Sequence, residues 1–398
     1  MRLFVRATAL LVFPSAVVRT QEPVTRQQAI ESAVTRGARA AVARADTLVG
    51  SAQLLSARQW ENPSLALTYS KSVPRYHEIV DLPLDLTGVK SARVRSAEAT
   101  RLASQYRFEF ARAAAALDAD TTYTRALAAL EHLRLSRRNA RDADSLRRMS
   151  IVRRDAGDAS ELDVLLATVN AGRASNQAAA DSLTYVSTLF DLQAVMGLDN
   201  DRIAVTPVDS LALPQSPNPD ALPERALPIV AAEQALTAAE LSVRAQRRSL
   251  FTPFSIQAGI EHSDPSERGI LPTFGFSIPL PILNRNRGPI ALAEAERERA
   301  RAEVQLVRIE TRSAIGRAIR LRNLALQKIQ RDRVLVESAA RIAAMSLTAY
   351  REGAQGLPAV LEAQRNAREI LSQYIDDLAD AWVATATLRL YNLTPSAR

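Results

Sequence analysis

The feature that most restricts the fold is a stretch of about 65 residues, 90–154, that contains neither proline nor glycine. Apolar residues recur along it at three- and four-residue spacing, so it predicts one continuous helix. At 1.5 Å per residue this helix would be roughly 100 Å long, far longer than the helices of ordinary globular domains. Gly157 can end it, and Ser160 can cap a second helix that follows over 161–196.

The same order of elements is predicted twice along the chain. The first copy has a helix, two strands with period-two alternation and two further helices, over 24–58, 65–69, 80–86, 90–154 and 161–196. The second copy has the same elements over 220–249, 254–260, 273–280, 290–350 and 357–392. The helix-breaking Gly353 and Gly356 of the second copy correspond to the break at Gly157, and the offset of roughly 196 residues between Gly157 and Gly353 indicates an internal duplication.

The domain organisation follows from this duplication. Arg2 and Arg6 precede an apolar run over 7–18 that is too short to cross a bilayer, so residues 1–20 are interpreted as a signal peptide. A buried N-terminal helix is the alternative. We expect the first repeat over 21–206, a proline-rich linker over 207–219 and the second repeat over 220–398.

Composition argues against an enzyme. The chain has 13 glycines, 3 histidines and no cysteine, which leaves little material for phosphate-binding loops, histidine catalysis, disulfides or thiolate sites. His77 and His262 are predicted to lie singly in hairpin loops, without a second ligand at metal-binding spacing. The net charge is +8, but arginines alternate with acids along the helices, which is typical of solvated faces. We therefore expect no cofactor, no metal site and no nucleic-acid partner.

The four predicted strands have a length and pattern suited to a membrane. Each is apolar on one face for about nine to eleven residues, the length of a tilted membrane-spanning strand. Four strands cannot close a barrel, and an open edge in lipid leaves backbone groups unpaired. Two copies would supply eight strands with a filled interior, and three would supply twelve with room for a lumen. Alternatively, the hairpins cap a soluble coiled coil.

The residues between the last predicted strand and the second long helix carry a more specific signal. Residues 278–288 read IPLPILNRNRG, and 62–65 read NPSL before the first strand. With the duplicated order of elements, these stretches resemble the outer membrane efflux (TolC-like) family, and 278–288 resembles its CzcC-like heavy-metal branch. In that family this stretch is the turn from a barrel strand into a tunnel helix. The turn residues are Pro279, Pro281, Asn284, Arg285, Asn286 and Gly288. The prolines are expected to end strand pairing, and Asn, Arg and Gly to cap the helix; the corresponding 85–90 lacks the Asn-Arg pairs.

The resemblance implies a mainly α-helical protein with a transmembrane β-barrel portion, in which a homotrimer forms a twelve-stranded barrel in outer membrane lipid of a Gram-negative-type bacterium. It further implies a periplasmic tunnel that meets an adaptor (membrane fusion) protein and an inner membrane transporter, with heavy-metal cations as a candidate cargo and no catalysis. Two alternatives stay open: an outer membrane exporter of protein or polysaccharide, and a soluble helical scaffold.

The family closes its tunnel at the helix-turn-helix tips. Tyr350 and Asp163 stand at positions that carry gate-forming Tyr and Asp in the family, whereas Gln355 replaces a gate Arg and Ala359 an entrance Asp. The resemblance therefore implies a gate with fewer ion pairs and a weaker cation-attracting ring. Alternatively, the charges nearby are ordinary solvated helix ends. The predicted tip and gate residues are Asp163, Tyr350, Arg351, Glu352, Gln355 and Glu362.

Overall fold

The computed structural model describes residues 22–199, 201–214, 226–249, 254–262, 269–278, 280 and 282–392. The predicted signal peptide, the end of the proline-rich linker, Pro279 and Pro281 lie outside these residues. Within the described chain, none of the helices combines the length and the apolar character needed to span a membrane.

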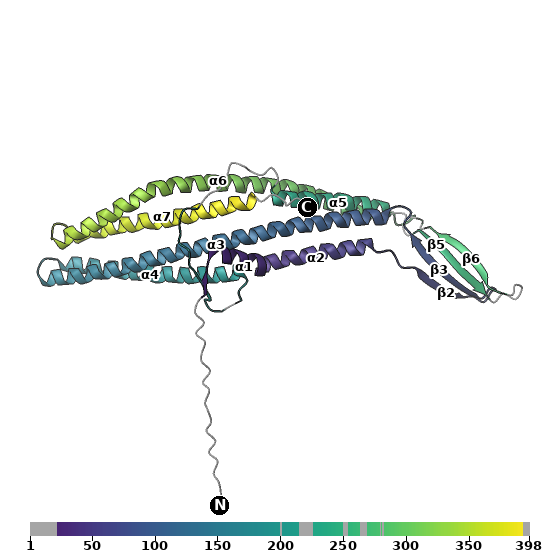
Figure 1. The fold of residues 1–398 in the computed structure, drawn as a ribbon, viewed down its shortest axis with the longest axis horizontal. Helices are drawn as coiled ribbons and strands as arrows, with labels where there is room; N and C mark the ends of the chain where they lie inside the picture. The colour runs from purple at the N-terminus through teal and green to yellow at the C-terminus, as the bar shows by residue number, and fades with distance from the viewer. Residues whose placement is uncertain are drawn as a thin grey trace, which may run out of the picture.

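The molecule is elongated, with a small sheet at one end and two helix-turn-helix tips at the other (Figure 1). The first set of elements is α1 Arg26–Arg36, α2 Ala38–Arg58, β2 Ser64–Tyr69, β3 Tyr76–Leu84, α3 Val89–Asp155 and α4 Glu161–Met196. The second set is α5 Leu227–Arg248, β5 Phe254–His262, β6 Leu271–Ser277, α6 Arg287–Arg351 and α7 Leu357–Tyr391. The two long helices contain 67 and 65 residues, which confirms the expected continuous helices.

Each long helix carries two shorter helices end to end along its side. α2 and α4 pack along α3, and α5 and α7 pack along α6, while α3 also contacts α5 and α7 (Figure 1). Small side chains at the contacts, such as the buried Ala119, Ala126 and Ala381, let the helix backbones approach closely. The helices of both repeats therefore form one continuous layered rod.

The helix predicted over 24–58 is wrong at its start. Residues Glu22–Val24 form a short strand, β1, that pairs in parallel with β4, Val205–Pro207. The helix then begins after Thr25, which forms a capping box with Gln28. It breaks at Gly37, whose backbone is extended at φ −58° and ψ 134° and where a Cβ would lie 2.2 Å from the Ala33 carbonyl oxygen.

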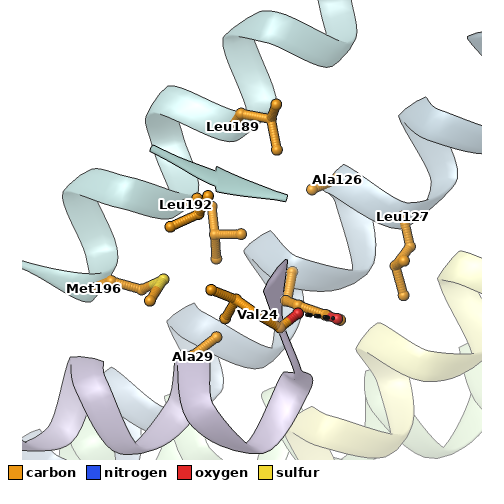
Figure 2. Close-up of a cluster of buried hydrophobic side chains, with 9 residues drawn as sticks. Val24, Ala29, Ala126, Leu127, Leu189, Leu192 and Met196 are labelled. Atoms are coloured by element: carbon orange, nitrogen blue, oxygen red, sulfur yellow. Dashed lines mark hydrogen bonds between the residues drawn. The ribbon is translucent and has the colours of Figure 1, made fainter. Parts of the chain in front are cut away.

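The β1–β4 pair is held by a buried cluster around Tyr123 of α3. The Tyr123 hydroxyl donates a hydrogen bond to the Val24 carbonyl at 2.8 Å and accepts bonds from the amides of Val208 and Asp209, both at 3.3 Å. Apolar side chains of α1, α3 and α4 surround it (Figure 2). The cluster ties the start of the first repeat to the segment that leaves it.

The four longer strands form one antiparallel sheet in the order β2-β3-β5-β6. Its central pair, β3 with β5, joins the two repeats, so β2 and β6 are the edges. One row of register partners consists of Leu65, Val80, Ala258 and Phe274, and the adjacent row consists of Ser64, Asp81, Gln257 and Gly275. The sheet therefore has an apolar face and a polar face, as the alternation predicted.

Strand bounds differ from the predicted ones. β3 begins at Tyr76, earlier than the predicted residue 80, because the Ser70 amide donates to the Arg75 carbonyl at 2.8 Å and closes a tight hairpin. β6 ends at Ser277, so the strand does not reach the predicted 280. α6 begins at Arg287, earlier than the expected Ile290.

The strand-to-helix turn uses its asparagines differently from the prediction. Asn286 occupies the N-cap position of α6 at φ 52°, but its side chain makes no capping bond. The side-chain nitrogen Nδ2 of Asn286 instead donates to the Gln246 carbonyl and the Ser249 hydroxyl, both at 2.8 Å, which anchors the turn to the end of α5. Asn284 accepts a bond from the Asn286 amide at 3.0 Å, while Arg285 and Gly288 are exposed.

The corresponding turn of the first repeat is capped in another way. Gly88 takes the left-handed N-cap conformation at φ 70°, and the Asp85 carboxylate accepts bonds from the amides of Val89 and Lys90, both at 2.8 Å. A carboxylate suits this place because the first turn of a helix presents free N–H groups and a positive dipole end. The two turns therefore share a backbone shape but not a set of side chains.

Candidate functional site

The predicted site lies where α3 turns into α4 and α6 into α7, at the end of the rod opposite the sheet (Figure 1). Both long helices end in the same left-handed motif. Gly157 has φ 84° and Gly353 has φ 77°, and the amides that follow bond back to the Arg153 carbonyl at 2.8 Å and the Ala349 carbonyl at 2.9 Å. A positive φ is readily adopted only by glycine, so both breaks were visible in the sequence.

The returning helices start differently at the two tips. Ser160 caps α4 as predicted: its hydroxyl accepts from the Asp163 amide at 3.2 Å, and the Asp163 carboxylate accepts from the Ser160 amide at 3.1 Å. α7 starts after Gly356, which has no side chain to cap it, with Pro358 in the first turn. The Asp163 carboxylate therefore forms its hydrogen bond within its own tip, with the N-cap residue of α4.

The two tips are joined by Arg153, which sequence analysis did not single out. Its guanidinium donates to the main-chain carbonyl of Tyr350 and lies 4.7 Å from the centre of the Tyr350 ring. A Cβ on Gly353 would lie 3.6 Å from the same guanidinium. The sequence did show a basic residue in the last turn of a helix, where free carbonyls attract cations. It could not show that the carbonyl it binds belongs to the other repeat.

Tyr350 is the centre of an apolar cluster between the tips. It is 3% exposed and packs with Leu146, Ala167, Leu357 and Val360. Its buried hydroxyl has no hydrogen-bond partner among the described residues, and burial raises the pKa of this phenol. Asp163 is near enough to raise the pKa further and Arg153 to lower it. The structure thus brings Tyr350 and Asp163 into the same neighbourhood.

The remaining predicted tip residues are more dispersed. Arg351 and Glu352 are exposed, and Gln355 is half-buried; in the described part of the chain none of the three has an ion pair or side-chain hydrogen bond. Glu362 lies farther along α7, in a groove of about 830 Å³ between α3, α4 and α7. Side chains of both positive and negative charge line the groove, among them Arg173, Arg365, Glu369 and Asp376.

The histidines in the sheet are not in loops, contrary to the prediction. His77 is in β3, 3.1 Å from the Glu261 carboxylate, and His262 is in β5, stacked on Tyr76 at 5.0 Å between ring centres. No set of three or more metal-ligating side chains gathers among the residues that the structure describes. Among those described residues, neither histidine has two further metal-ligating side chains beside it.

Comparisons with known proteins agree with this architecture. The family model described as outer membrane efflux protein matches residues 29–198 and 219–394. The cobalt-zinc-cadmium resistance protein CzcC of Cupriavidus metallidurans is 26% identical over 238 residues, which cover 58% of this chain and 57% of that protein. The match thus spans little more than half the length of that relative.

Solved structures show the same fold. A membrane protein from Pseudomonas aeruginosa superimposes with a TM-score of 0.79 at 21% identity, covering 92% of this chain and 93% of that one. The Campylobacter jejuni CmeC outer membrane channel gives a TM-score of 0.78 at 15% identity, covering 98% and 93%. The family model covers most of this chain in two segments, and the chain therefore belongs to the outer membrane efflux protein family.

Proposed function

We propose that three copies of this chain join their sheets edge to edge into a closed twelve-stranded barrel that continues into a helical tunnel. The β3–β5 pair carries this proposal. It joins the last strand of the first repeat to the first strand of the second, in antiparallel register. The same relation between copies pairs β6 of one chain with β2 of the next, which leaves no open edge.

The faces of the sheet fit this arrangement. The residues Leu67, Phe274 and Phe276 are 70%, 79% and 71% exposed. They form a large apolar surface that must be shielded from water. The opposite face carries Asp81 and Ser255, whose side chains hydrogen bond at 2.7 Å, and it would line the pore. An apolar outside and a polar inside are the pattern of membrane barrels.

The proposed role is a passive conduit in the outer membrane. The rod would extend into the periplasm, where its tips would meet an adaptor protein and, through it, an inner membrane transporter that supplies the energy. Membership in the efflux family supports this role. The similarity to a cobalt-zinc-cadmium resistance protein favours divalent metal cations as the cargo.

The tips would act as the gate of this conduit. Tyr350, Asp163 and Gln355 lie where the two helical hairpins meet or turn, and in the described part of the chain Gln355 offers no ion pair to close them. A gate with few ion pairs should leak. Gln355→Arg is expected to lower the conductance of the closed channel in planar bilayers; unchanged conductance would refute the weak gate without affecting the barrel.

One experiment tests the conduit itself. The full chain, residues 1–398, is expressed in a Gram-negative host, the outer membrane is extracted in mild detergent, and the protein mass is measured by light scattering. A trimer in that fraction is the expected result. A soluble monomer or dimer would overturn the barrel and favour the scaffold. For the cargo, purified trimers in a bilayer should pass cobalt, zinc and cadmium; exclusion of these ions would favour the protein or polysaccharide exporter.

A further inference from the structure

Midway along the rod, α6 and α7 bury an acidic group in their interface. Asp377 of α7 is 1% exposed, next to an apolar cluster that contains Ile329 of α6 and Leu378 of α7. One carboxylate oxygen, Oδ1, accepts from Lys328 Nζ at 3.0 Å and from Gln373 Nε2 at 3.1 Å. A buried carboxylate requires such partners, because burial without them is costly.

The second oxygen of Asp377 has a different neighbour. Oδ2 of Asp377 and Oδ2 of Asp332 are both buried, and neither has a donor among the described residues. Asp332 follows Lys328 by four residues on α6 and so shares the helix face that meets Asp377, and a side-chain hydrogen bond with Asp377 contributes to its raised pKa. Two ionised carboxylates in contact repel each other, whereas one proton between them turns the contact into a hydrogen bond.

We propose that Asp332 and Asp377 share one proton, and that this carboxyl pair is a pH-sensitive clasp that fastens α6 to α7. With the proton in place, the Asp332 carboxyl donates to Asp377 Oδ2 and satisfies both buried oxygens. When the proton leaves, Lys328 can neutralise only one of the two charges. The interface then opens locally and admits water.

The surrounding charges agree with this assignment. Burial, followed by the hydrogen bond with Asp377, raises the pKa of Asp332, while Arg331 and Lys328 oppose the shift. Burial and the charges of Asp377 and Asp376 raise the pKa of Asp380 on α7. A raised carboxyl pKa means that the folded state binds a proton that the unfolded state releases. The stabilisation is therefore full below the ordinary aspartate pKa and is lost as pH rises through the folded pKa.

A proton fits the site better than a metal cation. The Lys328 ammonium already stands 3.0 Å from Asp377 and would repel a second cation. No group of three ligating side chains surrounds the pair in the part of the chain that the structure describes. A divalent ion would therefore have to complete most of its coordination with water.

The test is hydrogen–deuterium exchange on the full chain in detergent at pH 5 and pH 8, corrected for the intrinsic dependence of exchange on pH. Residues 325–335 and 373–384 should open more readily at pH 8, by about tenfold for each unit by which the folded pKa is raised. Asp332→Asn supplies a permanent donor, so these segments should stay protected at both pH values. Glu337→Gln, an exposed α6 acid whose side chain is 78% exposed, is the control and should behave like the original chain.

A second variant gives an independent test of the carboxyl pair. Lys328→Gln removes the ammonium and should move the pH of opening upward, because the loss of a cation raises a carboxyl pKa further. His132 of α3 bonds Asp376 of the same α7 segment at 2.9 Å. If Asp332→Asn keeps the original pH response, that response belongs to a group other than the carboxyl pair and the clasp is refuted. Protection that depends on added zinc would equally refute it, in favour of a cation site.

Discussion

Arg153 of α3 donates a hydrogen bond to the main-chain carbonyl of Tyr350 in α6 and places its guanidinium over the Tyr350 ring, 4.7 Å from its centre. The same carbonyl accepts the Gly353 amide at 3.1 Å, within the motif that ends α6. One side chain of the first repeat thus supports the helix end of the second. The alignment of the two tips depends on this contact.

Replacing Arg153 by alanine should therefore loosen one tip from the other. A charged hydrogen bond contributes about 1.5–3 kcal/mol and a cation–π contact about 1 kcal/mol, so the local loss should be roughly 2.5–4 kcal/mol. Exchange of the amides of residues 345–356 should accelerate accordingly. The matched control is Arg154→Ala, since the ion pairs of Arg154 with described residues are to Asp155 and Glu161 of its own hairpin. Equal acceleration in both variants would contradict the assignment.

The glycines at the helix breaks should be intolerant of a side chain. Gly157→Ala and Gly353→Ala must adopt φ near 80°, which costs about 1 kcal/mol each. Gly172→Ala is the control, because Gly172 lies inside α4 with no atom within 4 Å of an added Cβ and should gain up to about 1 kcal/mol in helix propensity. Thermal unfolding of the three variants measures the difference; a gain in melting temperature at either break would be inconsistent with the left-handed turn.

The two helices that return from the tips have different N-caps, so substitutions at the two cap residues should change stability in opposite directions. Ser160→Ala removes a capping box and should cost about 1 kcal/mol. Gly356→Ser should cost nothing and add a few tenths of a kcal/mol, because Gly356 already has the extended N-cap conformation and its nearest neighbour, Pro358, would lie 3.7 Å from a new Cβ. Local exchange at the start of α4 and of α7 would show whether the two changes differ in sign.

The faces of the sheet can be tested by the same substitution at adjacent residues of β6. Phe274→Lys places a charge on the apolar face, where lipid contact would cost about 2–4 kcal/mol near the middle of the bilayer. Thr273→Lys places it on the polar face, where no such cost applies. The yield of trimer in the outer membrane fraction should fall for the first variant alone. Equal yields would show that the apolar face is not covered by lipid.

The Tyr123 phenol should make the rod sensitive to strong alkali. Burial, more than any other cause, raises the pKa of Tyr123 to about 12 from an ordinary value near 10. The folded state keeps a proton that the unfolded state releases, so stability should be lost as pH rises from about 10 to 12, by roughly 2–3 kcal/mol. Tyr123→Phe lacks the titrating hydroxyl and should be less stable at neutral pH but show a shallower alkaline decline. An unchanged slope would assign the decline to other groups.

Local periodicity was sufficient for the long elements and insufficient for the contacts between them. The helix expected over 90–154 is Val89–Asp155, because the absence of proline and glycine and the breaker at Gly157 fix it locally. The three-residue β1 has no periodicity to detect, and its pairing with β4 depends on Tyr123. Similarly, nothing around Arg153 indicates that its partner lies 197 residues further along the chain.

The pairing of β3 with β5 also has an evolutionary consequence. If the two halves of the chain descend from one shorter protein, the β3–β5 pairing was once a contact between separate molecules. Six such short chains would then have formed the barrel that is now proposed for three copies of this chain. Fusion of two such chains would then have joined every second strand junction of the ring covalently and freed the halves to diverge. Asp85 and Asn286 now perform different tasks at corresponding turns, as do Ser160 and Gly356 at the tips. On that descent the chain would be a fused dimer whose two halves have specialised.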